Sequence, residues 1–286
     1  MKLIVSAPPF VKRGMTTGKI QWAVVAALAP IMAVSIHIFG VRALAILGVS
    51  IGSAVVTEIA CRLVAGKEVR MMDSSAVITG ILLALLVPSQ APLWIPMVGA
   101  IFAIGIVKEA FGGNGNNIFN PALAGWVFIM MAWAVHTVAV PGPVQPLAVI
   151  QDQAVRLIET SPVALVIPAL FLMAFKCMDW RVPFSYLAFT LAFAFLLQQD
   201  YSFVFSGIYA LGVFFFVTDP VTTPVTKKGR VLFGIGCGFL TVLYAKFACF
   251  VEGIGLSILL MNAVTPLLDR FTIPKPTVVK NIYEDL

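Results

Sequence analysis

The chain has 286 residues, of which 60% are hydrophobic and only 11% are charged. A soluble globular domain is roughly 45–50% apolar and about 25% charged, so this composition excludes a water-soluble domain and a disordered chain. The formal net charge of +6 comes from basic residues spread over many short segments, which is not the clustered pattern of a nucleic-acid-binding protein. The sequence predicts a protein that crosses a membrane several times.

The apolar runs predict about ten transmembrane helices, because roughly 20 apolar residues are needed to cross the hydrocarbon core as a helix. The range 75–87 is short and leads into Pro88, Pro92 and Pro96, so we expect a broken or partly re-entrant helix there. The ten predicted ranges are 20–39, 43–64, 75–87, 93–110, 118–135, 162–178, 182–197, 201–217, 231–250 and 254–268.

These ranges form two groups of five, which predicts an all-α polytopic membrane protein built from two repeats. Because five is an odd number, the second repeat would be inverted relative to the first. The predicted organisation is an N-terminal segment (1–19), a first repeat (20–135), a short extracytoplasmic loop (136–161), a second repeat (162–268) and a C-terminal tail (269–286).

The basic residues predict the orientation. Ten crossings place both termini on one side of the membrane, and cytoplasmic segments carry the excess of Lys and Arg. If the termini are cytoplasmic, all but three of the 19 Lys and Arg residues lie on the cytoplasmic side, the exceptions being Arg42, Arg156 and Lys246. We therefore expect the N-terminal segment and the C-terminal tail to be cytoplasmic.

The four cysteines do not form a metal-binding motif. Cys61, Cys177, Cys237 and Cys249 lie far apart, inside or beside apolar runs, and no C-x-x-C pair occurs. Zinc and iron–sulfur sites need such clustered ligands. We expect these cysteines to be small buried side chains, and the sequence predicts no metal site.

Three polar segments are unusual for a membrane protein, and all are expected on the cytoplasmic side. The first, residues 108–125, contains three glycines and four asparagines ahead of Pro121, which favours close backbone approach and supplies many amide groups. Because Pro121 is suited to the first position of a helix, the asparagines flank a helix N-terminus that could bind a polar ring or an anion. The alternative is a tight turn between helices with asparagine caps.

The second polar segment, 218–226, contains Asp219 before Pro220 and several threonines, whose hydroxyl groups can satisfy helix carbonyls or bind a ligand. The third, 72–76, opens the short range 75–87, and its alternative interpretation is a helix N-cap.

The charged residues near the predicted helix ends have simpler explanations. Glu58 is expected to pair with Arg62 four residues later. Lys108 and Glu109 are expected to extend from an inner helix end toward water. None of these residues falls at the centre of a predicted span, so a proton path of buried carboxylates within this chain is not expected.

The polar segments are similar to those of a family of membrane proteins. The chain resembles the RnfD subunits of the Rnf ion-translocating electron-transport complexes and, more distantly, the NqrB subunits of the sodium-pumping NADH:quinone reductases. The residues that carry the resemblance are 72–76, 78–85, Pro88, Pro92, Trp94, Lys108, 111–113, Asn117, 119–122, 159–161, 180–183, 218–222, Pro224, Thr226, 229–230, 252–253 and 259–262.

The resemblance implies a ten-span subunit of urea-transporter-like fold in the cytoplasmic membrane of a prokaryote. It implies partners among iron–sulfur and flavin proteins, and an electron path through flavin between ferredoxin and NAD, coupled to Na⁺ or H⁺ movement. Such a chain is part of a translocase and is not an enzyme alone, since the flavin carries the redox chemistry and the protein positions it.

One feature departs from the family. The family attaches FMN covalently to a threonine of an S/T-G-A-T motif in the loop between the fifth and sixth spans. Here residues 138–156 contain no Ser or Thr, and G-A-T occurs nowhere in the chain. Thr160 and Ser161 match a separate E-T-S segment of the family. We therefore expect no covalent FMN in this protein.

A noncovalent riboflavin or FMN is the cofactor expected instead, beside the two longer polar segments. Its predicted binding residues are Asn117, Phe119, Asn120, Thr218, Asp219 and Thr222. The alternative function, from a different class, is a solute channel or transporter of the same fold that lacks redox activity.

Overall fold

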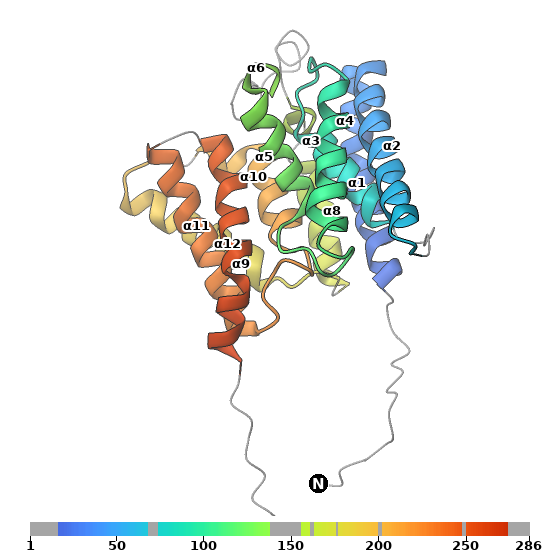
Figure 1. Ribbon diagram of the computed structural model, residues 1–286. Helices are drawn as coiled ribbons and strands as arrows, with labels where there is room; N and C mark the ends of the chain where they lie inside the picture. The colour runs from blue at the N-terminus through green and yellow to red at the C-terminus, as the bar shows by residue number, and fades with distance from the viewer. Residues whose placement is uncertain are drawn as a thin grey trace, which may run out of the picture.

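The computed structural model describes residues 17–67, 74–137, 156–160, 163–175, 177–199, 202–247 and 250–273, and within them the extended regular elements are all helices (Figure 1). The α-helices are α1 (Thr17–Phe39), α2 (Val41–Val64), α3 (Ser75–Leu86), α4 (Trp94–Phe102), α5 (Pro121–Ala132), α6 (Ala134–Thr137), α8 (Val163–Ala174), α9 (Arg181–Leu196), α10 (Gly207–Leu211), α11 (Lys227–Phe247) and α12 (Phe250–Thr272). Two π-helical turns are η1 (Ala103–Glu109) and η4 (Gly212–Phe216), and two 3₁₀ turns are η2 (Leu157–Thr160) and η3 (Ser202–Phe205).

In the described part of the chain, four helices are long and apolar enough to cross a membrane: α1, α2, α11 and, within α12, Gly253–Thr272. Shorter apolar helices, among them α3, α5 and α9, lie between them. The all-helical, multi-pass class predicted from composition is therefore confirmed. Each of the ten predicted ranges overlaps a helix, while the number of membrane crossings and the repeat boundaries stay predictions. The predicted loop 136–161 lies mostly outside the described residues.

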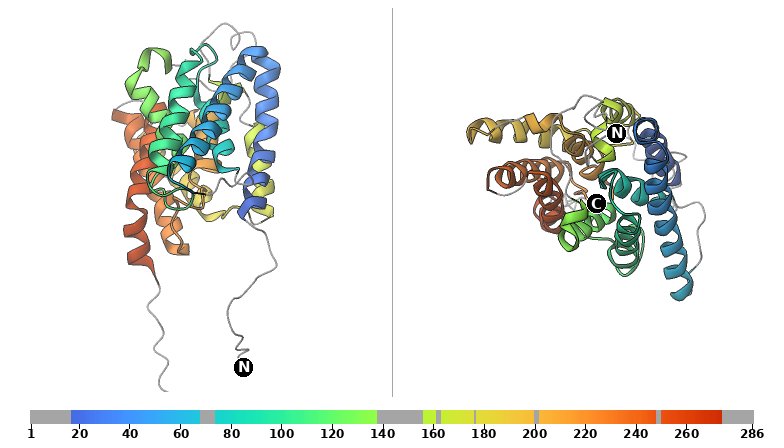
Figure 2. Two further views of the ribbon diagram at one scale, coloured as in Figure 1. Left: turned by 45° about the vertical axis from the view of Figure 1, so that its right-hand side comes forward. Right: turned by 90° about the horizontal axis from the view of Figure 1, so that it is seen from above.

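The helices form a bundle in which α1 and α2 lie on one side and α9, α11 and α12 on the other, with α3 and α5 between them (Figures 1 and 2). α1 begins and α12 ends at the same end of the bundle, at the bottom of Figure 1. We call this end the terminal side. Residues that lie near Thr17 and Thr272 along the bundle axis are therefore on the terminal side.

α3 is the short helix at the centre of the bundle. All but three of its twelve residues are buried, because α1, α2, α4 and α5 all pack against it. Beyond its end, the guanidinium of Arg42 donates hydrogen bonds to the carbonyls of Ser89 (3.1 Å) and Ala91 (2.6 Å). A half-length helix needs such partners, because polar backbone groups at membrane depth must be satisfied within the protein.

The contact between α2 and α3 depends on a glycine, which gives a testable prediction. The Ser50 hydroxyl donates to the Gly80 carbonyl (2.8 Å), and a Cβ at Gly80 would lie 2.6 Å from the Ile51 Cα. Gly80→Ala is therefore expected to push the helices apart and to lower the free energy of unfolding by about 1–3 kcal/mol, measured by denaturant titration in detergent. Gly52→Ala on α2 is the control, because a Cβ there meets no atom within 4 Å. Equal stability of the two variants would contradict this prediction.

Candidate functional site

A cavity of about 280 Å³ lies where α1, α3, the start of α5 and the loop after η4 meet. Its apolar walls include Ile20, Val24, Leu82 and Phe215. Its polar lining includes residues from all three of the polar segments singled out in the sequence, and consists mainly of Ser75, Thr79, Lys108, Asn114, Asn117, Asn120, Thr218 and Asp219. An apolar space with a few convergent polar groups is the usual form of a ligand site.

Asn120 joins two of these segments. Its side-chain oxygen accepts a hydrogen bond from the Leu123 N–H (3.2 Å), which caps the N-terminus of α5 ahead of Pro121. Its amide nitrogen donates to the carboxylate of Asp219 (3.1 Å), a residue 99 positions away. Asn120 is thus both a helix cap and part of the cavity wall, and ligand binding by the asparagine-rich segment stays a prediction.

Asp219 lies in the loop after η4 and is surrounded by donors. Besides Asn120, the Val221 N–H (3.2 Å) and the Thr222 hydroxyl (3.3 Å) donate to its carboxylate. Burial raises the pKa of Asp219 above its ordinary value, although these three hydrogen bonds act in the opposite direction. The cavity wall therefore carries a carboxyl group that takes up a proton more readily than an exposed aspartate.

The structure brings four of the six predicted binding residues to the cavity wall: Asn117, Asn120, Thr218 and Asp219. The other two, Phe119 and Thr222, are not among the lining residues. The Phe119 carbonyl accepts a hydrogen bond from the Asn117 amide (3.0 Å), and Thr222 holds Asp219. These two residues position the lining groups, and flavin binding by the set stays a prediction.

The loop that carries Asp219 is fastened to α12. Thr265 on α12 donates to the Thr222 carbonyl (3.0 Å). The carboxylate of Asp269, further along α12, accepts hydrogen bonds from the N–H groups of Val225 (3.0 Å) and Thr226 (3.3 Å). Since α12 is one of the long apolar helices, the loop takes its position from a rigid element.

Sequence reasoning missed the part played by Lys108. The expectation that Lys108 and Glu109 extend toward water is wrong, because their side chains are only 2% and 6% exposed. Lys108 is an ion-pair partner. Its ammonium group donates to the carboxylate of Glu58 (2.7 Å) and to the hydroxyl of Ser75 (2.6 Å). The predicted Glu58–Arg62 pair is confirmed at 2.5 Å, and Arg62 lies 3.7 Å from Glu109. A buried chain of alternating charges therefore ends at the cavity.

Two of the three segments that supply polar groups to the cavity are associated with π-helical turns. Lys108 lies in η1, ahead of the asparagines, and η4 ends two residues before Thr218. A π-turn inserts an extra residue into the helical repeat and so changes the direction of the side chains that follow, and such turns are frequent at functional sites. The π-turn η1 therefore gives a local reason why the Lys108 side chain points into the bundle.

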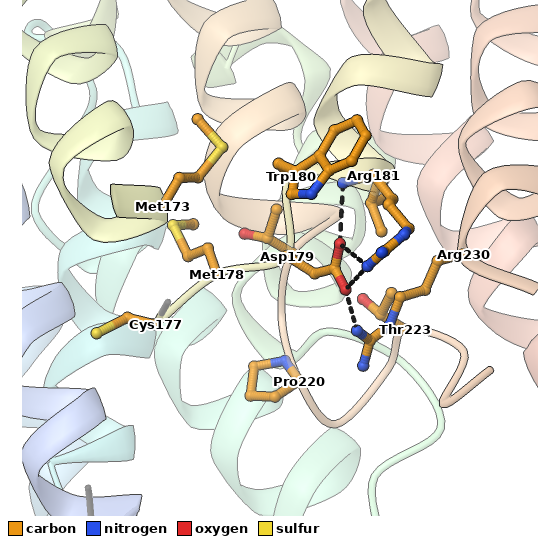
Figure 3. A pocket seen from close by; sticks show the side chains of 11 residues that line it. Met173, Cys177, Met178, Asp179, Trp180, Arg181, Pro220, Thr223 and Arg230 are labelled. Carbon is orange, nitrogen blue, oxygen red and sulfur yellow. Dashed lines mark hydrogen bonds and ion pairs between the residues drawn. The ribbon is translucent and has the colours of Figure 1, made fainter. Parts of the chain in front are cut away.

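A second cavity of about 430 Å³ adjoins the first and shares Cys177, Met178, Thr218 and Pro220 with it. Asp179 lies at its centre, with the side chains of Arg181 and Arg230 pointing toward it (Figure 3). The carboxylate accepts hydrogen bonds from the Arg181 backbone N–H (2.9 Å), the Arg181 guanidinium (3.0 Å) and the Arg230 guanidinium.

The pKa of Asp179 gives a prediction for stability. Burial acts to raise this pKa, but the hydrogen bonds from Arg181 and Arg230 and their charges outweigh burial and hold it below the ordinary 3.8. The ionised carboxylate therefore stabilises the folded state above pH 3.8, and this contribution is lost as the pH falls through the lowered pKa. The midpoint temperatures of thermal unfolding of the wild-type chain and of Asp179→Asn should differ by a constant amount near neutral pH. The two midpoints should converge under strong acid. The same difference at every pH would contradict this.

The fold and the cavity define an all-helical, multi-pass membrane protein with an internal polar site. The chain matches the NQR2, RnfD, RnfE family over residues 4–278 and belongs to it.

Three relatives resemble the chain over nearly their whole length. It is 39% identical to the D subunit of the ion-translocating oxidoreductase complex of Methanosarcina acetivorans, over 95% of this chain and 96% of the relative. It is 37% identical to the D subunit of the Na⁺-translocating ferredoxin:NAD⁺ oxidoreductase complex of Acetobacterium woodii, over 95% and 94%. It is 33% identical to the D subunit of the proton-translocating ferredoxin:NAD⁺ oxidoreductase complex of Clostridium ljungdahlii, over 94% of each chain.

Proposed function

We propose that this chain is the RnfD component of an Rnf-type complex, which passes electrons between ferredoxin and NAD and couples this transfer to Na⁺ or H⁺ translocation. The observation that carries the proposal is the match, over nearly the full length of both chains, to the D subunits of three ion-translocating oxidoreductase complexes, two of which are named ferredoxin:NAD⁺ oxidoreductases. Because one of these relatives belongs to a Na⁺-translocating complex and another to a proton-translocating complex, the likeness favours neither cation.

We propose further that a noncovalent flavin, riboflavin or FMN, binds in the cavity beside Asn120 and Asp219. A flavin is an apolar ring system with hydrogen-bonding edges, and the cavity combines apolar walls with amide, hydroxyl, ammonium and carboxyl groups. Its volume of about 280 Å³ is close to the lower end of the roughly 300–1,000 Å³ of small-molecule sites. The flavin supplies the redox chemistry, while the protein orients it and sets its potential.

Three residues would interact with the flavin, two through hydrogen bonds and one through its charge. Asn117 and Asn120 offer amide groups that both donate and accept. Lys108 brings a buried positive charge to the cavity wall, and charge beside a flavin ring is one of the means by which a protein tunes the redox potential of the flavin.

The expectation that no FMN is attached covalently rests on the sequence of residues 138–156, almost all of which lie outside the described part of the chain.

We place the terminal side of the bundle in the cytoplasm of a prokaryote, with iron–sulfur and flavin proteins of the complex as partners. The predicted excess of Lys and Arg on this side supports the orientation, as does the position of both candidate cavities beside segments predicted to be cytoplasmic. We expect no nucleic acid among the partners of this chain.

We also propose that the helices form two inverted five-helix repeats of urea-transporter type. In the first group, α1 to α5, the third helix is α3, and all but three of its twelve residues are buried. In the second group, α8 to α12, the third helix is α10, and all five of its residues are buried. A buried third helix in both halves is the pattern that a repeat of this kind would produce.

Reconstitution tests the proposed function. Liposomes that contain the full complex should couple the oxidation of reduced ferredoxin by NAD⁺ to cation movement, whereas liposomes whose complex lacks this chain should do neither. Full activity without the chain would contradict the proposal. Solute flux through the chain alone, with no contribution to electron transfer, would instead favour the channel or transporter function.

A further inference from the structure

The second cavity contains more positive charge than its own carboxylate neutralises. Arg181 and Arg230 both pair with Asp179, the one carboxylate found beside them in the described part of the chain, so the three side chains together carry one net positive charge. Each guanidinium has five N–H donors. Within the same described residues, the acceptors for these donors are Asp179 and the Pro224 carbonyl, which engage only some of them. The remaining donors are available to an anion that enters the cavity.

Further cations lie at the same place. Lys227 and Lys228 begin α11, within one helical turn of Arg230, and both are exposed. The positively charged region therefore extends beyond the cavity mouth along the terminal side of the bundle. Basic pockets between membrane helices at this level are typical binding sites for anionic lipid headgroups.

Exposed aromatic side chains lie on or beside α8 and α9, which flank the cavity, and one of them, Trp180, lines it. Trp180 is 56% exposed and stacks against the Arg181 guanidinium, 5.3 Å from the ring centre. One turn further along α9, Phe184 is 67% exposed, and Phe171 and Phe175 are exposed near the end of α8. Tryptophan is enriched at the level of lipid headgroups, and phenylalanine beside it is suited to contact with hydrocarbon. Figure 3 shows Trp180 beside the arginine cluster.

We propose that the cavity between α8, α9 and α11 binds the phosphate headgroup of an anionic membrane phospholipid. Arg181 and Arg230 contact the phosphate, Asp179 holds the two guanidiniums in position, and Trp180 and Phe184 lie against the start of the hydrocarbon chains. This site adjoins the proposed flavin cavity and shares Thr218 with it, but lipid binding here requires neither a bound flavin nor the proposed electron-transfer function.

Native mass spectrometry of the purified complex in detergent tests this proposal. With equal amounts of phosphatidylglycerol and phosphatidylcholine, the wild-type complex should retain phosphatidylglycerol preferentially. Arg181→Gln should weaken phosphatidylglycerol binding about fivefold, the effect of one basic residue near a membrane surface. Arg181 is preferred to Arg230 because the Arg230 Nε also donates to the Pro224 carbonyl and so supports the neighbouring loop.

Arg270→Gln is the matched control, because Arg270 is an exposed arginine near the end of α12 on the same side of the bundle. It should bind phosphatidylglycerol as the wild-type complex does. Equal binding by wild type and Arg181→Gln would overturn the proposal. It would also be overturned if inorganic phosphate bound here while phosphatidylglycerol did not, or if Arg181→Gln released a neighbouring protein of the complex without changing lipid binding.

Discussion

Replacement of Lys108 by methionine is expected to lower the free energy of unfolding by about 3 kcal/mol. Removing one partner of a buried ion pair costs about 3–5 kcal/mol, because the other charge is left without compensation in a low-dielectric region. The lower end of this range applies here, since Arg62 remains 2.5 Å from Glu58 after the substitution. The Ser75 hydroxyl also loses its contact with the ammonium group.

Denaturant titration of the purified chain in detergent measures this loss. Lys67→Met is the matched control, because Lys67 is exposed and donates only to the Gly112 carbonyl (3.2 Å) in the described part of the chain; a change within about 0.5 kcal/mol is expected. The double variant Lys108→Met/Glu58→Gln should recover part of the stability, since the buried negative charge is then removed as well. Equal stability of Lys108→Met and Lys67→Met would contradict a stabilising ion pair between Lys108 and Glu58.

The second large effect is expected at Asp219, on flavin affinity. Asp219→Asn keeps only one of the two side-chain oxygens, so the side chain cannot accept both from Asn120 on one side and from the Val221 N–H on the other, and one of these donors loses its acceptor. An unsatisfied buried group costs about 1–3 kcal/mol, and each 1.4 kcal/mol is a factor of ten in affinity. If Asn120 and Asp219 form the flavin site, riboflavin or FMN should bind about 10- to 100-fold more weakly to the variant.

Fluorescence titration of the flavin-depleted chain with riboflavin and with FMN gives these affinities. Asp179→Asn makes the same chemical change in the neighbouring cavity and is the control, with an expected change of less than about twofold. An unchanged affinity of Asp219→Asn, in a chain that still unfolds cooperatively, would show that the flavin binds elsewhere.

Much of the fold could be predicted from local sequence. The length and composition of the apolar runs are sufficient to predict helices such as α1 and α2, since a continuous apolar run of about 20 residues has few other stable forms. The short α3 could be expected from the prolines that follow it. The asparagine cap of α5 is equally local, because Asn120 and Pro121 are adjacent and both favour a helix start.

The candidate site could be predicted only in part. The polar segments were recognisable because glycine, asparagine and threonine are unusual between apolar runs, but the contact between Asn120 and Asp219 joins residues 99 positions apart, and no local pattern encodes it. The sequence predicts a water-facing Lys108, because a lysine at a helix end ordinarily extends outward. Its burial depends on Glu58 and Ser75, which come from two other helices.

Release of flavin from the denatured chain tests the central claim most directly. The full chain, purified in detergent, is denatured with acid, and the protein and the supernatant are examined separately for flavin fluorescence, with the mass of the protein measured in parallel. We predict about one flavin per chain in the supernatant, a protein mass equal to the 30.7 kDa of the sequence, and loss of the flavin from Asp219→Asn. No flavin in either fraction, or flavin that remains on the protein and adds to its mass, would contradict a noncovalent flavin site in this chain.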